Sequence, residues 1–368
     1  MSAARRLRLR QSVGIVIGPG SVEFFKSNTR TSLTMRLQAA GALEFLKNFD
    51  GRETLAQIGA RYSRLPFHQV EAFASTLLHH HVLIEHDEDY SQSLVEEHYR
   101  LVNLLEDYFH STSAVTAAIG RIRRSKVAII GLGAVGSQIA IHLVRLGIGA
   151  LVLMDPDTVD LSNLHRQSYF EQDIGCHKAT QLKERLKEVN PGVEVTTVLG
   201  MLDEGSLQDS AFEDVDLIVN CADYPSVDHT SRLVAAFAMR KSTPHIVGGG
   251  YNLHLTLIGQ TIIPGKTACF MCFHTFLQRL NEAELQDVRR LHREDRKLGS
   301  FAPLSGIAAS LAALDAWKVL CGAESFIQNA NRRIEFDSRA YRFNVIDIPQ
   351  SPECSWCGTN IAGSPVPI

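Results

Sequence analysis

The chain has 368 residues, 45% of them hydrophobic, which is enough to bury one large core and a second small one. Its formal net charge of -3 at pH 7 and pI near 6.6 exclude a general electrostatic attraction to nucleic acid or anionic lipid. Glycines and a proline interrupt the residues after the basic N-terminus, so no secretory apolar core forms. We predict a cytoplasmic protein without a transmembrane segment.

The first ninety residues predict a small domain of strands and helices. Val13 to Ile17, Val22 to Phe25 and Thr31 to Met35 read as strands, and Val82 to Glu85 as a closing strand. Between them, apolar residues recur at helical spacing in three segments. These segments are Ala42 to Phe49, Leu55 to Tyr62 and Val70 to Leu77. The pattern is typical of a winged-helix module.

The remaining chain predicts an α/β domain. A helix-like segment runs from His98 to Arg123, and from Lys126 short apolar runs alternate with helical patterns. Those runs are Val127 to Ile130, Leu151 to Met154, Val193 to Val198 and Leu217 to Val219. Such alternation indicates a mainly parallel, Rossmann-like sheet covered by helices. We therefore expect a winged-helix domain over residues 1–90, a helical linker over 91–125 and an α/β domain over 126–368. The late apolar stretch, Ala302 to Cys321, carries Asp315 and Lys318 and predicts a buried helix.

A glycine turn between the first strand and helix of the α/β domain predicts a nucleotide pocket. Gly131, Gly133 and Gly136 let the backbone approach phosphates, which the helix N-terminus stabilises. Asp155 ends the next strand, 155 - 136 = 19 residues after the last glycine, where an acid accepts hydrogen bonds from ribose hydroxyls. These features alone fit an NAD-dependent oxidoreductase equally well.

Polar residues beyond the second strand favour ATP chemistry. Hydride transfer has no need for cations there, whereas cleavage between the α- and β-phosphates of ATP needs them to stabilise charge in transfer. Asp223, just past the strand ending at Val219, is well placed to bind Mg²⁺. The residues concerned are Asn163, Arg166, Gln167 and Lys178.

Four of the seven cysteines form two close pairs, Cys269 with Cys272 and Cys354 with Cys357. In a cytosolic chain this pattern favours metal over disulfides. Four thiolates make the tetrahedral set that Zn²⁺ accepts, so we predict a structural zinc site. Unligated or redox-active thiols are the alternative.

The ordered motifs of residues 126–368 resemble the ThiF, MoeB and ubiquitin-activating family, whose members adenylate a carboxylate and release pyrophosphate. The matching motifs are Gly131-x-Gly133-x-x-Gly136, Asp155-x-Asp157-x-Val159, Ser162-Asn163-Leu164-x-Arg166-Gln167, Gly175-x-x-Lys178 and Ala222-Asp223. The resemblance implies that Asp155 holds ribose and that Asp223 supports Mg²⁺ and the attacking carboxylate. It also implies that Asn163, Arg166, Gln167 and Lys178 contact phosphates. Asp157 either binds the nucleotide or shapes its loop.

Residues 8–86 resemble the PqqD-type domain, which holds the leader of a ribosomal precursor peptide by adding it to a sheet edge. The resemblance implies a peptide partner. The family also implies a homodimer in which an arginine reaches the partner's ATP site. Arg100 either serves that role or is a surface arginine of a helix.

The chain also resembles the peptide-modifying branch of the MccB and PaaA enzymes, from microcin C and pantocin A biosynthesis. The matching motifs are Gly248-Gly249-Gly250-Tyr251, Ile263-Pro264-Gly265-Lys266-Thr267-x-Cys269, Phe301-Ala302-Pro303 and Cys354-Ser355-x-Cys357-Gly358. Residues 273–300 contain no cysteine to capture an acyl group as a thioester, which favours capture by nitrogen. We expect activation of glutamate side chains for cyclisation. C-terminal nucleotidylation of a peptide, adenylation of a sulfur carrier and a peptide-binding protein with a decayed site are the alternatives. The arginine-rich segment Gln278 to Lys297 is either a cover for an acidic peptide or a solvated helix face.

Overall fold

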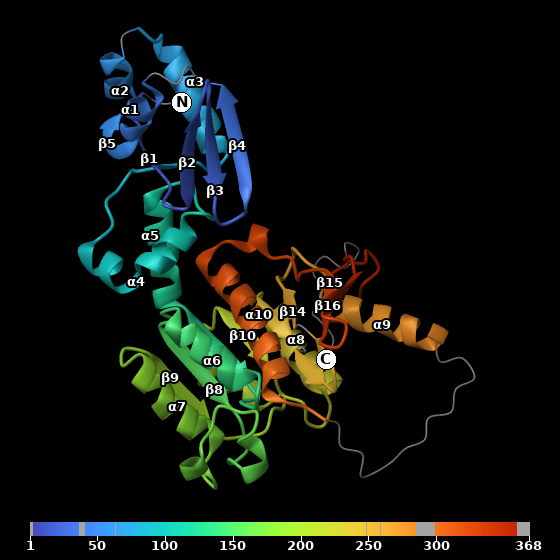
Figure 1. Cartoon of the computed structure of the whole chain (residues 1–368). Helices are drawn as coiled ribbons and strands as arrows, with labels where there is room; N and C mark the ends of the chain where they lie inside the picture. Colours follow the sequence, from blue (N-terminus) through green and yellow to red (C-terminus); the bar gives the residue numbers. More distant parts are fainter. Residues whose placement is uncertain are drawn as a thin grey trace. The chain divides into compact units, whose positions relative to one another are not determined.

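The protein is described by a computed structural model over residues 3–36, 41–62, 64–247, 249–257, 259–284 and 299–358. The chain forms two compact units, residues 1–120 and residues 121–368 (Figure 1). The helices of the predicted linker, residues 91–125, fall almost entirely within the first unit.

The N-terminal unit contains two antiparallel sheets of three strands each, in the orders β5-β1-β6 and β2-β3-β4. All of the strands expected from the sequence are present. Strands β1 and β5 were not predicted, although Arg6-Leu7-Arg8-Leu9 in the basic terminus alternates charged and apolar residues as a strand does. The strands are β1 (Arg6–Leu9), β2 (Val13–Gly18), β3 (Ser21–Lys26), β4 (Thr31–Arg36), β5 (Asp50–Thr54) and β6 (Leu83–Glu85).

Three short helices pack on these sheets, and two further helices follow. Phe24, Leu46 and Leu77, from β3, α1 and α3, meet in one buried apolar core. The single helix expected from His98 to Arg123 was wrong: the segment contains two helices, and the first already begins at Gln92, where Ser91 Oγ accepts a hydrogen bond from the Leu94 amide at 3.3 Å. The helices are α1 (Ala42–Lys47), α2 (Leu55–Arg61), α3 (Phe67–His79), α4 (Gln92–Leu105) and α5 (Thr112–Arg124).

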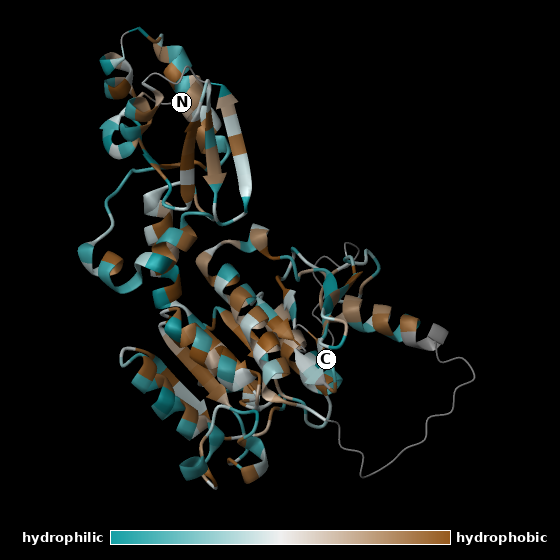
Figure 2. Cartoon of the chain, viewed as in Figure 1, coloured by the Kyte–Doolittle hydropathy of each residue, from teal (hydrophilic) through white to brown (hydrophobic). Residues whose placement is uncertain are grey.

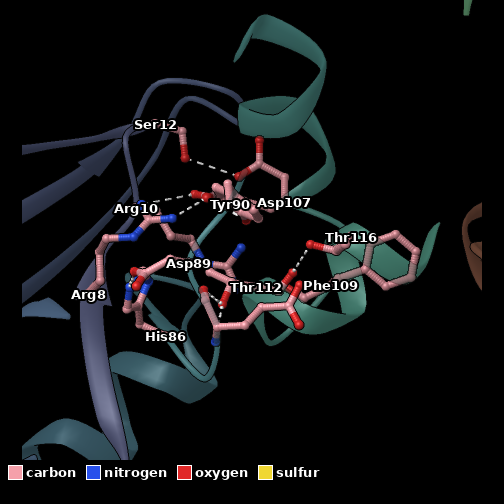
Figure 3. A network of polar contacts seen from close by, with 12 residues as sticks. Arg8, Arg10, Ser12, His86, Asp89, Tyr90, Asp107, Phe109, Thr112 and Thr116 are labelled. Atoms are coloured by element: carbon pink, nitrogen blue, oxygen red, sulfur yellow. Dashed lines mark hydrogen bonds and ion pairs between the residues drawn. The ribbon is translucent and has the colours of Figure 1, made fainter. Parts of the chain in front are cut away.

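A buried polar network ties the first strand to the segment around α4 (Figure 3). The carboxylate of Glu106, with 2% of its side chain exposed, forms an ion pair with Arg8. It also accepts a hydrogen bond from the Tyr90 hydroxyl at 3.0 Å. Arg10 is 2% exposed and donates to two backbone carbonyl oxygens, each at 3.0 Å. Burial lowers the pKa of Arg10 despite the nearby carboxylates of Asp107 and Glu106.

The second unit is built on a six-stranded sheet in the order β14-β11-β10-β7-β8-β9. All neighbouring strands are parallel except β14, which runs antiparallel to β11. The predicted α/β class with a mainly parallel sheet is confirmed. The strands are β7 (Lys126–Ile130), β8 (Ala150–Met154), β9 (Glu194–Val198), β10 (Leu217–Asn220), β11 (His245–Val247) and β14 (Gln260–Ile262).

The central strands β7, β8 and β10 are apolar (Figure 2), and nearly all of their residues are buried, as in a sheet covered on both faces. Alternate residues such as Ala128, Val152 and Ile218 join the core formed with α8, and α6 lies against α10, where Gln138 Nε2 donates to Ser305 Oγ at 3.4 Å. By length and composition α10 could span a membrane, but 67% of that window is buried in the fold, as expected for a core helix. The helices are α6 (Gly136–Arg145), α7 (Lys178–Val189), α8 (Val227–Arg240), α9 (Phe270–Glu284) and α10 (Ala302–Cys321).

A second, antiparallel sheet of this unit was not predicted; its strand order is β12-β13-β15-β16. Gly250, Leu257 and Glu335 lie opposite one another on three adjacent strands and therefore share one face. The strands are β12 (Gly250–Asn252), β13 (Leu255–Leu257), β15 (Arg332–Asp337) and β16 (Arg342–Asp347). Short 3-10 helices complete the unit: η1 (Leu161–Asn163), η2 (Glu171–Asp173), η3 (Ser206–Gln208), η4 (Ser210–Phe212) and η5 (Glu324–Phe326).

Candidate active site

A cavity of about 1000 Å³ opens at the carboxyl ends of β7, β8 and β10. Strand order reverses beside β7, and open α/β sheets bind their ligands at such a point. Every residue that the sequence suggested for nucleotide and magnesium binding lines this cavity. These residues are Gly131, Gly133, Gly136, Asp155, Asp157, Asn163, Arg166, Gln167, Lys178 and Asp223.

Glycine is required at the three positions of the turn for different geometric reasons. Gly131 has a φ of +85°, and an added Cβ would lie 2.6 Å from the Ala222 nitrogen. A Cβ at Gly136 would lie 2.0 Å from the Gly131 oxygen. Gly133 differs, because within 4 Å its Cβ would meet only Gln167 Nε2, at 3.9 Å. Two glycines therefore allow close backbone packing, whereas Gly133 leaves the turn open to a ligand at the N-terminus of α6.

Asp155 fixes the shape of the glycine turn. Its side chain is buried, and its Oδ2 accepts a hydrogen bond from the Leu132 amide at 2.6 Å. Its Oδ1 accepts one from the Asp157 amide at 2.9 Å. Burial raises the pKa of Asp155, while these hydrogen bonds and the Lys178 charge oppose the rise. Each oxygen keeps a further lone pair, so the carboxylate can accept hydroxyl donors of a ligand as well.

Two cations lie on the side of the cavity next to the turn. Lys178, at the start of α7, is 7% exposed in its side chain, and its Nζ lies 2.7 Å from Asp157 Oδ2. Arg166 Nη1 donates to the Ser162 carbonyl oxygen at 2.6 Å. Asn163 Oδ1 accepts from the Asp160 amide at 3.1 Å, which closes the 3-10 turn before Arg166. The loop after β8 is thus shaped by its own polar side chains.

Three further polar side chains line the cavity: Gln167, Asp223 and Tyr251. Asp223 is exposed and follows β10, and the Oε1 atom of Gln167 is buried without a hydrogen-bond partner in the described part of the chain. Such an atom needs a donor from a ligand or water. Burial raises the pKa of Tyr251, against hydrogen bonds with Arg166 and Ser300 that lower it. Tyr251 therefore connects the cation of the turn side to β12.

The four paired cysteines form one cluster, with Sγ atoms all within 4.8 Å of one another. Cys269 and Cys354 are separated by 3.4 Å between their sulfur atoms, and Cys272 and Cys357 by 3.5 Å. A tetrahedral zinc site with Zn–S bonds of about 2.3 Å places its sulfurs roughly 3.8 Å apart. The thiols therefore fit Zn²⁺, as the sequence predicted, and would join the start of α9 to the C-terminal segment.

Other predicted residues are not among those that line the cavity or fall outside the described residues. Arg100 belongs to the N-terminal unit, where it is exposed and donates to the Tyr99 hydroxyl at 2.8 Å. Its role in a partner's site stays a prediction. Most of the arginine-rich segment, from Gln278 to Lys297, falls outside the described residues, as does Gly248.

Sequence reasoning missed Arg333 and Glu335, which line the same cavity from β15. Their alternation along a strand was visible in the sequence. Nothing in the sequence paired that strand with β13, which lies far earlier in the chain, so their position could not be inferred.

The profile of the ThiF family matches residues 112–356, more than half of the chain. The chain belongs to the ThiF family. Its relatives include the sulfur carrier protein ThiS adenylyltransferase of Escherichia coli K12, 30% identical over 235 residues that cover 64% of this chain and 86% of that protein. The predicted family and enzyme class are thereby confirmed: this ThiF-family protein is an ATP-dependent adenylating enzyme.

Solved structures extend the similarity in fold to nearly the whole chain. MccB of E. coli, solved with ATP, gives a TM-score of 0.75 at 21% identity, covering 96% of this chain and 99% of MccB. PaaA gives 0.69 at 21% identity, covering 93% of this chain and 100% of PaaA. The PqqD-like character of residues 8–86 stays a prediction.

Proposed function

We propose that this enzyme adenylates a carboxylate of a ribosomally made precursor peptide, with ATP as the second substrate. The observation that carries the proposal is the single cavity in which the glycine turn, Asp155, two cations and Asp223 come together. The fold neighbour MccB has been solved with MccA bound, which supports a peptide substrate here. We further propose that residues 8–86 hold the leader of that peptide, that the enzyme is a cytoplasmic homodimer, and that Arg100 completes the partner's site.

In the proposed reaction, a carboxylate oxygen of the peptide attacks the α-phosphorus of ATP. The bond between that phosphorus and the bridging oxygen to the β-phosphate breaks, and pyrophosphate leaves. Lys178 and Arg166 stabilise the charge that builds on the phosphate oxygens. Lys178 is held in place by Asp157 before ATP arrives, so little reorganisation is needed. Asn163 and Gln167 donate amide hydrogen bonds to the same phosphates.

The other cavity residues orient the nucleotide. Asp155 accepts hydrogen bonds from the ribose hydroxyls, and the open face at Gly133 lets the triphosphate approach the N-terminus of α6. Asp223 offers exposed carboxylate oxygens, the ligands that Mg²⁺ takes together with phosphates. Bound there, Mg²⁺ would neutralise phosphate charge next to the incoming carboxylate.

The fate of the adenylate follows from the absence of a cysteine in residues 273–300. Without a placed thiol there, we propose that a nitrogen of the peptide attacks the activated carbonyl and releases AMP. Glutamate side chains that cyclise in antibiotic biosynthesis are the proposed substrates. C-terminal nucleotidylation of the peptide and adenylation of a sulfur carrier ending in Gly-Gly are the competing outcomes.

Pyrophosphate exchange tests this proposal. The pure protein with ATP, Mg²⁺, labelled pyrophosphate and the precursor peptide encoded beside its gene is expected to incorporate label into ATP only when the peptide is present. Exchange with a Gly-Gly carrier instead would redirect the proposal to sulfur transfer. Absence of exchange with either substrate would refute it.

A further inference from the structure

The antiparallel sheet contributes a second wall to the cavity, besides the wall formed by the glycine turn. Arg333 and Glu335, two residues apart on β15, both line the cavity, and Arg333 Nη2 lies 2.7 Å from Glu335 Oε1. Each side chain is 25% exposed, which is intermediate between a buried and a solvated ion pair. Leu255 and Leu257, on the paired strand, lie opposite Asp337 and Glu335 and share this face.

Cationic side chains line both sides of the cavity, but in unequal number. Lys178 and Arg166 come from the segments next to the glycine turn, whereas Arg333 is the one cation that the antiparallel sheet adds among the described lining residues. Gly250 lies in the same row as Glu335, and an added Cβ there would meet nothing within 4 Å. The space in front of this row is therefore open. A cavity near the upper end of the ~300–1000 Å³ typical for small-molecule sites has room for an acyl segment besides a nucleotide.

The guanidinium of Arg333 is only partly used. It can donate five hydrogen bonds, and in the described part of the chain its side chain contacts Glu335 alone among polar groups. Its other edge can accept a second carboxylate in the bidentate manner that arginine favours. Glu335 would then repel the incoming acid while keeping the guanidinium oriented.

We propose that Arg333 binds a carboxylate of the substrate next to the one that reacts, so that the preferred acyl segment is acidic. Glu335 limits the affinity for that carboxylate, and the two leucines contact the aliphatic stem of the acidic side chain. This inference rests on the proposed adenylation, because the site lies in the same cavity. It adds a selection for acidic sequence around the reacting residue.

Binding of defined adenylate analogues tests the inference without turnover. The probes are 5′-O-(N-glutamylsulfamoyl)adenosine, whose free side-chain carboxylate represents the neighbouring acid, and its leucyl counterpart. Calorimetric titration of the wild-type enzyme is expected to give tighter binding of the glutamyl probe. Arg333→Gln is expected to weaken binding of the glutamyl probe by about 10- to 100-fold. The affinities for ATP and for the leucyl probe should stay within about 2-fold of the wild-type values.

The opposite effects expected of Arg333→Gln and Glu335→Gln distinguish recognition of a substrate carboxylate from a purely structural role of the ion pair. Glu335→Gln is expected to strengthen binding of the glutamyl probe several-fold, because it removes the repulsion. If the pair merely holds the strand together, both variants weaken both probes, and this outcome would overturn the inference. Arg332→Gln is the matched control, since Arg332 is the adjacent residue on β15 and pairs with Asp347 at 3.0 Å instead.

Equal binding of both probes to the wild-type enzyme would also overturn the inference. A different result would show that the proposed adenylation itself is wrong. In that case the peptide-dependent pyrophosphate exchange is absent, whatever the selectivity between the two probes.

Discussion

Polar and charged side chains have different roles in the two units of this protein. In the N-terminal unit, the Glu106 carboxylate is almost fully buried, and Arg8 and the Tyr90 hydroxyl both bond to it. In the cavity of the second unit, Asp223 is exposed and Gln167 has a buried oxygen without a partner in the described chain. Polar groups whose hydrogen bonds are made within the protein stabilise the fold, whereas groups with unused donors or acceptors are available to bind a ligand. Substitution of a group of the first kind should therefore lower stability, and substitution of a group of the second kind should lower activity.

The cysteine cluster sharpens this comparison, since its four sulfurs are placed to bind a metal ion rather than a protein group. We expect the purified enzyme to contain one zinc per chain, and Cys272→Ser to lose it and to unfold at a markedly lower temperature. The apparent free energy of binding for structural zinc is about 10–16 kcal/mol, so this effect is the largest we expect. Metal analysis and thermal unfolding measure it, with the exposed Cys176→Ser as control. Equal zinc in both variants would contradict a four-cysteine site.

Glu106→Ala tests the saturated network. The substitution leaves Arg8 and the Tyr90 hydroxyl without their shared carboxylate, and removing one partner of a buried ion pair costs about 3–5 kcal/mol. Urea unfolding of the N-terminal unit should show this loss, while ATP binding stays at the wild-type level. Glu96→Ala, an exposed change in α4, the helix that ends just before Glu106, serves as the control. Weakened ATP binding with unchanged stability would reverse the expected division of roles.

Lys178→Met tests the unsaturated site and should give the opposite result. Loss of one charge-stabilising donor typically lowers the rate about 100- to 1000-fold, so pyrophosphate exchange should fall by that factor. Stability should be unchanged or slightly higher, because a buried ammonium is replaced by an apolar side chain of similar length. Lys187→Met, exposed on the same helix, should keep full activity. A stable variant with normal exchange would remove Lys178 from the reaction.

The sequence predicted local features of this fold well and long-range ones poorly. Gly131, Asp155 and Lys178 could be placed in one site because each follows a strand or begins a helix of a regular alternating pattern. The β15 residues could not, since strand pairing across the antiparallel sheet leaves no local signal. The start of α4 was missed for another reason: its N-cap residue, Ser91, lies in a polar stretch.

The central claim, attack of a peptide carboxylate on the α-phosphorus of ATP, is tested most directly by following oxygen. A precursor peptide with ¹⁸O in its glutamate side-chain carboxylates is incubated with enzyme, ATP and Mg²⁺, and the released nucleotide is analysed by mass spectrometry. We expect one ¹⁸O atom in AMP for each new bond in the peptide. Label in inorganic phosphate together with ADP would show attack on the γ-phosphorus and contradict the account.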